Sequence, residues 1–409
     1  MTTTKNNGHK KLNVPNLRFP EFQGEWEEKR LSEIADLFKG NGISKEQLTD
    51  TGEPCILYGE LYTKYKSEVI SDIFSKTDID TRKLVKSKAN DVIIPCSGET
   101  AVDIATARCV PYDNILLGGD LNIIRLYDCD GSFMSYQLNG KRKYDLAKVA
   151  QGVSVVHLYG DHLKGVKTYN PCLEEQKKIA KLLSLLDERI ATQNKIIDKL
   201  QSLIKGLNDT LYAQHGDEVM TSFAELGTSY SGLSGKSAHD FGSGKPFITY
   251  LNVYSNNVIN EKGFQYVTIK DGEKQNVVEC GDVLFTLSSE TPEEVGIGSV
   301  YLGKEKVYLN SFCFGIHITN TEVAFPLFLS YYVSSTAFRK FIYPYAQGST
   351  RFNLCKADFE KASIKLPTLE NQKRIYSILS HIDNKIITER QVLDLYNSQK
   401  QYLLRQMFI

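Results

Sequence analysis

The sequence predicts an α+β protein built as a pseudo-two-fold tandem repeat, in which two β-rich α/β domains are separated by two long helices that form an antiparallel intramolecular coiled coil. Three observations support this prediction. A segment recurs 196 positions further along the chain (347 − 151 = 196), each copy opens a long helix with a heptad pattern, and short β-rich runs precede each copy.

The bulk properties favour a multi-domain globular protein. The 409 residues exceed one ordinary core, and 41% hydrophobic with 24% charged residues is typical of folded protein. Lys plus Arg and Asp plus Glu both number 49, so no net charge would hold the chain on DNA or on an anionic membrane non-specifically. None of the eight cysteines forms a C-x-x-C pair, and no apolar run is long enough to span a bilayer. We therefore expect a cytoplasmic protein with reduced thiols and a loose N-terminal tail at residues 1–24.

The repeat is clearest around the start of each long helix. Ala150-Gln151-Gly152 recurs as Ala346-Gln347-Gly348, and ten identities follow at the same offset. These are Pro171, Leu173, Glu174, Gln176, Lys177, Ile179, Leu183, Ser184, Asp187 and Ile190, matched by Pro367, Leu369, Glu370, Gln372, Lys373, Ile375, Leu379, Ser380, Asp383 and Ile386. The chain is a duplication of one unit.

A fainter similarity appears earlier in each unit. Asp91-Val92-Ile93 followed by Ser97, Glu99 and Thr100 corresponds to Asp282-Val283-Leu284 followed by Ser288, Glu290 and Thr291 (282 − 91 = 191). Two interpretations are equally open: a shared strand and turn, or a shared functional loop.

Two long helices, alike in the two repeats, are predicted at residues 171–216 and 367–409, each starting after a proline with carboxylates in its first turn. Apolar residues alternate at steps of four and three, which is the pattern of a coiled-coil seam. The predicted seam residues are Ile179, Leu183, Leu186, Ile190, Ile197, Leu200, Ile204, Leu207 and Leu211, then Ile375, Leu379, Ile382, Ile386, Leu393, Tyr396, Leu403 and Met407. The polar interruption at Gln193 recurs as Glu389, as a register-setting layer or as a solvent-facing position. The connection from Ala213 to Ser222 is too short for a parallel return, so we expect antiparallel helices.

The predicted domains occupy residues 25–170 and 217–366. Strands are expected at Cys55–Tyr58, Val92–Pro95, Asn122–Tyr127, Phe247–Tyr254, Val283–Leu287 and Phe314–Ile318, and a helix at each of Phe133–Ala150 and Phe325–Tyr343.

Loops rich in aromatic, small polar and basic residues are candidates for contacts with DNA phosphates and base edges. For any single residue, an ordinary solvated loop position is the main alternative. The candidates are Lys39, Asn41, Ser44, Lys45, Tyr58, Tyr62, Lys64, Lys66, Ser97, Glu99 and Thr100 in the first domain, and Tyr230, Ser231, Ser234, Lys236, Ser237, Tyr254, Ser288, Glu290, Thr291 and Arg351 in the second.

No catalytic set is evident. Gly235-Lys236-Ser237 ends like a P-loop, but Tyr230 occupies the position where that motif needs glycine. No glycine-rich methyl-donor motif occurs, the seven histidines lack metal-ligand spacing, and no Ser/His/Asp arrangement recurs in both units. A duplicated body without a duplicated acid, base or nucleophile favours a binding protein with neither a catalytic residue nor a metal.

The chain resembles the specificity subunits of Type I restriction-modification systems over nearly its whole length. The resemblance rests on Leu17-Arg18-Phe19-Pro20-Glu21-Phe22 with Gly24-Glu25-Trp26, and on the helix entries at residues 171–179 and 366–375. The first entry departs from the family pattern with Asn170 in place of leucine.

The resemblance implies a non-catalytic subunit in which each target-recognition domain reads one half of a bipartite site on double-stranded DNA. The helices would set the gap and dock two modification subunits, which methylate adenine with S-adenosylmethionine. Restriction subunits would use ATP and Mg for translocation and cleavage. In this scheme Arg351 approaches the DNA backbone or a partner subunit. The alternative is a coiled-coil scaffold whose β-rich domains bind peptides, and an autonomous nuclease or methylase has little support.

Overall fold

The computed structural model describes residues 12–152, 155–214 and 216–409. Residues 1–11 of the predicted tail, Val153 and Ser154 directly after Gln151-Gly152, and position 215 lie outside the described residues. The chain forms two compact units. Unit 1 comprises Met1–Asn194 with Gln391–Ile409, and unit 2 comprises Lys195–Arg390, so each unit holds one β-rich domain and half of each long helix.

Unit 1 is organised around a four-stranded antiparallel sheet of order β2-β10-β6-β8. Its strands are β1 (Glu27–Arg30), β2 (Ala35–Lys39), β3 (Leu48–Thr49), β4 (Glu53–Ile56), β5 (Ser75–Thr77), β6 (Asp91–Pro95), β7 (Ser97–Gly98), β8 (Arg108–Val110), β9 (Leu116–Leu117), β10 (Leu121–Leu126), β11 (Val156–His157) and β12 (Lys167–Asn170). Its short α-helices are α1 (Leu31–Ile34), α2 (Glu60–Thr63), α3 (Ala101–Ile104), α4 (Gly131–Asn139), α5 (Lys143–Lys148) and α6 (Gly160–Lys164), and its 3-10 helices are η1 (Lys45–Gln47) and η2 (Thr81–Lys83).

Both faces of this sheet are buried. Along β6, Val92 and Ile94 face one apolar cluster, while Ile93 faces the other, as the alternation of side chains along a strand requires. Unit 1 also contains a second four-stranded sheet, of order β3-β5-β4-β9. The pairing of β1 with β12 joins the two ends of the first β-rich domain next to the start of the long helix.

Unit 2 repeats this plan, with a sheet of order β14-β21-β17-β19 and with β13 paired to β24. Its strands are β13 (Glu218–Thr221), β14 (Gly227–Ser231), β15 (Phe241–Ile248), β16 (Gln265–Val267), β17 (Val283–Thr286), β18 (Ser288–Ser289), β19 (Gly298–Val300), β20 (Tyr308–Leu309), β21 (Cys313–Ile318), β22 (Ala346–Gln347), β23 (Phe352–Leu354) and β24 (Ile364–Pro367). Its short α-helices are α8 (Phe223–Leu226), α9 (Tyr250–Ser255), α10 (Pro326–Tyr332), α11 (Thr336–Ile342) and α12 (Lys356–Lys361), and its 3-10 helices are η3 (Ala238–Asp240), η4 (Glu261–Gly263), η5 (Pro292–Glu294) and η6 (Tyr343–Tyr345).

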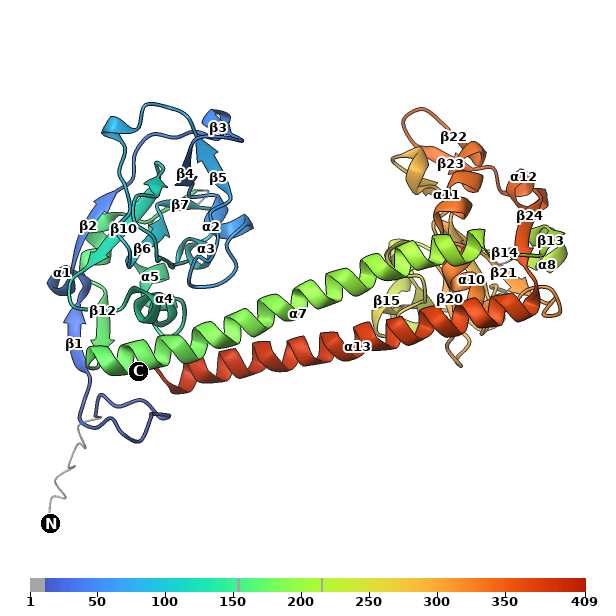
Figure 1. Cartoon of the computed structure of the whole chain (residues 1–409). Helices are drawn as coiled ribbons and strands as arrows, with labels where there is room; N and C mark the ends of the chain where they lie inside the picture. Colours follow the sequence, from blue (N-terminus) through green and yellow to red (C-terminus); the bar gives the residue numbers. More distant parts are fainter. Residues whose placement is uncertain (1–11, 153–154, 215) are drawn as a thin grey trace, which may run out of the picture. The chain divides into compact units, whose positions relative to one another are not determined.

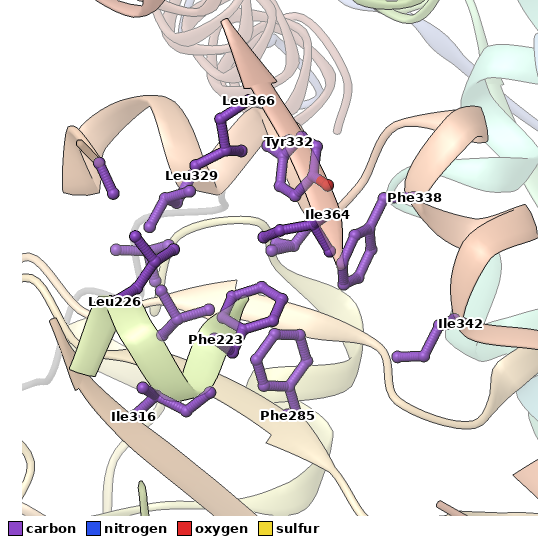
Figure 2. Close-up of a cluster of buried hydrophobic side chains, with 14 of the residues drawn as sticks. Phe223, Leu226, Phe285, Ile316, Leu329, Tyr332, Phe338, Ile342, Ile364 and Leu366 are labelled. Carbon is purple, nitrogen blue, oxygen red and sulfur yellow. The ribbon is translucent and has the colours of Figure 1, made fainter. Parts of the chain in front are cut away.

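The core of unit 2 is aromatic. Figure 2 shows Phe223 of α8 beside Phe285 of β17, with Phe338 of α11 and Tyr332 of α10 around them. The ring centroids of Phe223 and Phe285 lie 5.4 Å apart in an edge-to-face arrangement, which is favourable for aromatic pairs.

The long helices are α7 (Leu173–Ala213) and α13 (Leu369–Gln406) (Figure 1). In unit 1, Ile179 and Leu183 near the start of α7 share a buried cluster with Leu403 and Met407 at the end of α13 and just beyond it. In unit 2, Leu211 near the end of α7 packs on the cluster that contains residues from the start of α13. The predicted antiparallel pairing is thus confirmed within each unit.

All predicted apolar seam residues are buried or partly buried. Buried are Ile179, Leu183, Leu186, Ile197, Ile375, Leu379, Ile386, Leu403 and Met407, and partly buried are Ile190, Leu200, Ile204, Leu207, Leu211, Ile382, Leu393 and Tyr396. The polar position Gln193 is buried as well, and Glu389 forms an ion pair with Lys385 on the same helix.

The predicted helices at Phe133–Ala150 and Phe325–Tyr343 are each two helices. Gly140 ends the first of one pair, and Ser335 caps the start of α11 in the other by accepting from the amide of Phe338. The predicted strand Phe247–Tyr254 is also wrong in its second half, because Thr249 caps α9 and turns the chain into a helix.

The described part of the predicted loose tail is packed. Arg18 donates two hydrogen bonds to the buried carboxylate of Glu175, at 2.8 and 2.7 Å, and the Leu17 amide donates to the Gln406 carbonyl at 2.9 Å. These contacts hold residues 12–24 against the helices of unit 1, where a loose segment was expected.

Candidate nucleic-acid interface

A buried glutamine at the start of each long helix explains why the sequence there is repeated. Gln176 accepts from the Asp130 amide (2.9 Å) and donates to the Pro171 carbonyl (2.8 Å). Gln372 accepts from the Phe325 amide (2.8 Å) and donates to the Pro367 carbonyl (2.8 Å). Each buried glutamine therefore joins the β-rich domain to its helix by the same hydrogen bonds.

The shared Ser-x-Glu-Thr segment forms an equivalent loop in both domains. Tyr62 of α2 donates to the Ser97 carbonyl at 3.0 Å, and Tyr250 of α9 donates to the Ser288 carbonyl at 2.7 Å. Each serine lies on a short strand that pairs with the strand following a repeated Gln-Gly segment. In unit 1, β7 pairs with β11 after Gln151-Gly152, and in unit 2, β18 pairs with β23 after Gln347-Gly348. These two segments are named the Gln-Gly turns. The loop is thus held from two sides, and it brings together segments far apart in the sequence.

The Gln-Gly turns require glycine. Gly152 has φ +125° and Gly348 has φ +144°, a region that other residues rarely adopt. A Cβ at either glycine would lie 2.1 Å from a backbone oxygen, that of Val155 in one turn and that of Arg351 in the other. Val155 and Arg351 therefore occupy matching positions, both exposed, one apolar and one cationic.

In unit 1 the loop borders a cavity of about 740 Å³. The structure brings five of the predicted residues to it, namely Tyr58, Tyr62, Lys66, Ser97 and Glu99, together with Val155 and Arg108, which the sequence did not single out. Tyr58 and Glu99 are exposed, whereas burial raises the pKa of the Tyr62 phenol.

A second group in unit 1 joins two predicted residues, Lys39 and Ser97, to His157 and Tyr159, which the sequence did not single out because they come from a separate segment. The ammonium of Lys39 lies 5.6 Å from the Tyr159 ring centroid, and His157 stacks on Tyr159 with centroids 6.0 Å apart. Ser97 and His157 also meet at 3.2 Å between Oγ and Nδ1. Cationic and aromatic side chains that lie together suit contacts with phosphates and bases.

In unit 2, the guanidinium of Arg351 lies 5.6 Å from the ring centroid of Phe312, which is 54% exposed. Tyr254 donates to Glu294 at 2.7 Å and stacks near Tyr250. The candidates Lys45 in unit 1 and Ser231, Ser234, Glu290 and Thr291 in unit 2 are also exposed.

Two candidates of the second domain belong to its interior. Tyr230 is 7% exposed and donates to the buried carboxylate of Asp282 at 2.6 Å, so it supports the sheet and cannot reach a base. The side chain of Lys236 is 6% exposed, and its ammonium contacts Glu273 at 2.5 Å and the Thr268 carbonyl at 2.6 Å. The hydrogen bond from Lys236 lowers the pKa of Glu273 to about 2.

Other candidates serve local structure. Asn41 bonds two backbone groups, the Lys83 carbonyl and the Val85 amide, and Lys64 pairs with the buried Glu60 at 2.7 Å. Ser44, Thr100 and Ser237 cap helix starts, and Ser288 is buried. The sequence predicted candidate loops, but it could not distinguish the side chains that cap helices or stabilise the loops from those that are exposed.

Among the described residues, no group of three or more His, Cys, Asp or Glu side chains could hold a metal ion. Over the same residues, none of the helices combines the length and apolarity needed to cross a membrane.

Comparisons with known proteins agree on one family. The model of the Type I restriction modification DNA specificity domain matches residues 23–202 and 226–395. Two curated relatives come from Methanocaldococcus jannaschii. The Type I restriction enzyme MjaVIII specificity subunit is 26% identical over 95% of this chain and 92% of its own length, and the putative type I restriction enzyme MjaX specificity subunit is 24% identical over 97% and 96%.

Solved structures share the fold. The S subunit of a Type I restriction-modification system from M. genitalium has a TM-score of 0.59 at 16% identity, covering 97% of this chain and 99% of that chain. A chain from a structure of complex assembly and conformational transition in a type I R-M system has a TM-score of 0.58 at 16% identity, covering 94% and 97%. With two matched domains that span most of its length, this chain belongs to the family of Type I restriction-modification DNA specificity proteins.

Proposed function

We propose that this chain is the non-catalytic DNA-reading subunit of a Type I restriction-modification complex, in which each β-rich domain reads one half of a bipartite site. The proposal rests on one observation: the two domains share the same framework but display different side chains on it. The two units share the hydrogen bonds of Gln176 and Gln372 and the Gln-Gly turns. The side chains displayed beside the turns, Val155 and Arg351, differ.

The DNA contacts follow from exposure and charge. Lys45, Lys39 and Arg351 are exposed cations on the candidate loops, and each suits a phosphate. Tyr58 and Glu99 beside the unit 1 cavity suit base edges, because a carboxylate accepts from the cytosine amino group. Tyr254, Glu290 and Thr291 are the corresponding proposals in unit 2.

Selection of bound sequences from a random duplex library tests this function. The chain with its modification subunits should select two short fixed blocks separated by a gap of constant length. A scaffold whose domains bind peptides would select no sequence, and that outcome would contradict the proposal.

The long helices are proposed to set the gap between the half-sites. Each residue adds about 1.5 Å to a helix, so four residues inserted after Asn194, with four more inserted after Glu389 to keep the pairing, add about 6 Å. The selected gap should lengthen, or selection should be lost. An unaltered gap would show that the helices do not set the distance between the half-sites.

The helices also carry exposed apolar side chains suited to protein partners. These are Leu185, Ile196 and Leu203 on α7, and Ile378, Ile387 and Leu395 on α13. We propose that two modification subunits bind there and methylate adenine with S-adenosylmethionine, and that restriction subunits supply the ATP- and Mg-dependent steps.

A further inference from the structure

The two units differ at one place where the duplication would make them alike. In unit 1, Tyr136 donates to Asp187 Oδ2 at 2.7 Å, and the Lys400 ammonium lies 2.6 Å from Asp187 Oδ1 and 2.5 Å from Glu68 Oε2. The Lys400 side chain is 12% exposed. Burial acts to lower the pKa of Lys400, but the two carboxylates outweigh it and raise that pKa.

The matching positions in unit 2 follow from the repeat. Asp187 corresponds to Asp383 and Lys400 to Ile204, both at the same offset (383 − 187 = 196; 400 − 204 = 196). Glu68 corresponds to Asn257. The Glu68 carbonyl accepts from the amide of Cys109, which pairs with Val92, and the Asn257 carbonyl accepts from the amide of Val300, which pairs with Val283, the residue that matches Val92 in the repeat.

Unit 2 keeps the tyrosine and the aspartate but lacks the lysine. Tyr331 donates to Asp383 Oδ2, as Tyr136 does to Asp187. Among the described residues, no cation forms an ion pair with Asp383. In place of the lysine there is a cavity of about 760 Å³, here named the Asp383 groove, whose lining includes Ile204, Lys205, Asn257, Tyr331, Asp383 and Arg390.

Neither of the two cations in the lining, Lys205 and Arg390, takes the place of the lysine. Both are exposed, and among the described residues no ion pair joins either of them to Asp383. Arg390 lies seven residues from Asp383 on the same helix, which is about 10 Å along the axis. A partly buried carboxylate gains from a cation that approaches its free oxygen, and the hydrocarbon side chain of Ile204 cannot supply one.

We propose that the Asp383 groove receives a lysine or arginine side chain of a modification subunit, which occupies the place that Lys400 occupies in unit 1. This inference rests on the proposed function. It makes the two docking sites chemically unlike: the position in unit 1 is filled from within the chain, and the position in unit 2 is filled only in the complex.

Two substitutions in the full chain test the groove. Ile204→Lys supplies an internal lysine where unit 1 has one, and Asp383→Asn removes the charge that the partner would need. Ser202→Lys is the matched control, because it adds the same charge to an exposed position on α7 outside the groove lining.

The measurement is binding of the modification subunit encoded with this chain, by titration calorimetry and native mass spectrometry. We expect two subunits on the wild-type chain and on Ser202→Lys, and about thirtyfold weaker binding of one of the two on Ile204→Lys and Asp383→Asn. Ile204→Lys should keep the thermal midpoint of the wild-type chain, because its lysine pairs with Asp383.

Several outcomes would overturn the inference. If Ile204→Lys and Asp383→Asn both bound two modification subunits with wild-type affinity, no lysine or arginine of the partner would enter the groove. The proposed function would remain intact. Equal weakening by Ser202→Lys would show a general charge effect. A clear fall in the midpoint of Ile204→Lys would show that a lysine does not fit beside Asp383. Failure of the wild-type chain to bind any modification subunit would remove the proposed function itself.

Discussion

Replacement of Lys400 by isoleucine, the residue at the matching position of unit 2, should destabilise unit 1 strongly. The substitution leaves the carboxylates of Glu68 and Asp187, which are 10% and 9% exposed, facing each other without a cation. Removing one partner of a buried ion pair costs about 3–5 kcal/mol. For a unit of roughly 200 residues, that lowers the midpoint by about 6–20 °C.

Differential scanning calorimetry of the full chain measures the effect, since the transition of unit 1 should shift. An exposed pair in the same unit gives the control: Lys164 contacts Asp161 at 2.7 Å, and its replacement by methionine should leave the midpoint nearly unchanged, because an exposed ion pair contributes little to stability. The double variant Lys400→Ile/Glu68→Asn copies the arrangement of unit 2 and should recover most of the loss. Wild-type unfolding of Lys400→Ile, or no recovery in the double variant, would refute the reasoning.

Four further substitutions test separate features of the chain. Gly348→Ala should weaken DNA binding and destabilise its turn by about 1–3 kcal/mol, because φ there is +144°; unchanged unfolding would contradict this. Lys45→Ala should reduce the slope of log affinity against log salt by about one, whereas Lys236→Ala should lower the thermal midpoint and leave the slope unchanged; a reversed pattern would show that Lys236 contacts DNA. Arg18→Ala leaves the buried Glu175 without its partner, so residues 12–24 should become sensitive to limited proteolysis, and resistance equal to that of the wild type would argue against their docking.

The sequence predicted the elements that repeat. Heptad spacing and the short connection gave the two long helices and their antiparallel direction, because apolar periodicity is local information and a short link restricts how the chain can return. The duplicated Asp187 and Gln176 signalled importance, but their partners Tyr136 and Asp130 lie on a distant segment that no local pattern points to.

The errors arose where local patterns do not show what surrounds a residue. Tyr230 sits in a glycine- and serine-rich run that reads as a loop, yet it pairs in a sheet, with Asp282 as its hydrogen-bond partner. Lys400 falls at a heptad position of the apolar seam, but its partner cannot be predicted from local sequence, because Glu68 is more than three hundred positions away. The candidate loops were found from composition, whereas the roles of single residues in them depend on burial.

The central claim, that each domain reads its own half of one site, is tested most directly by mapping methylated adenines in cells that carry this chain as their specificity subunit. Residues 26–168 are then exchanged for the matching domain of another family member. We predict that one half of the methylated sequence changes while the other half and the gap stay the same. Methylation at unchanged sites, or a change in both halves at once, would contradict the account.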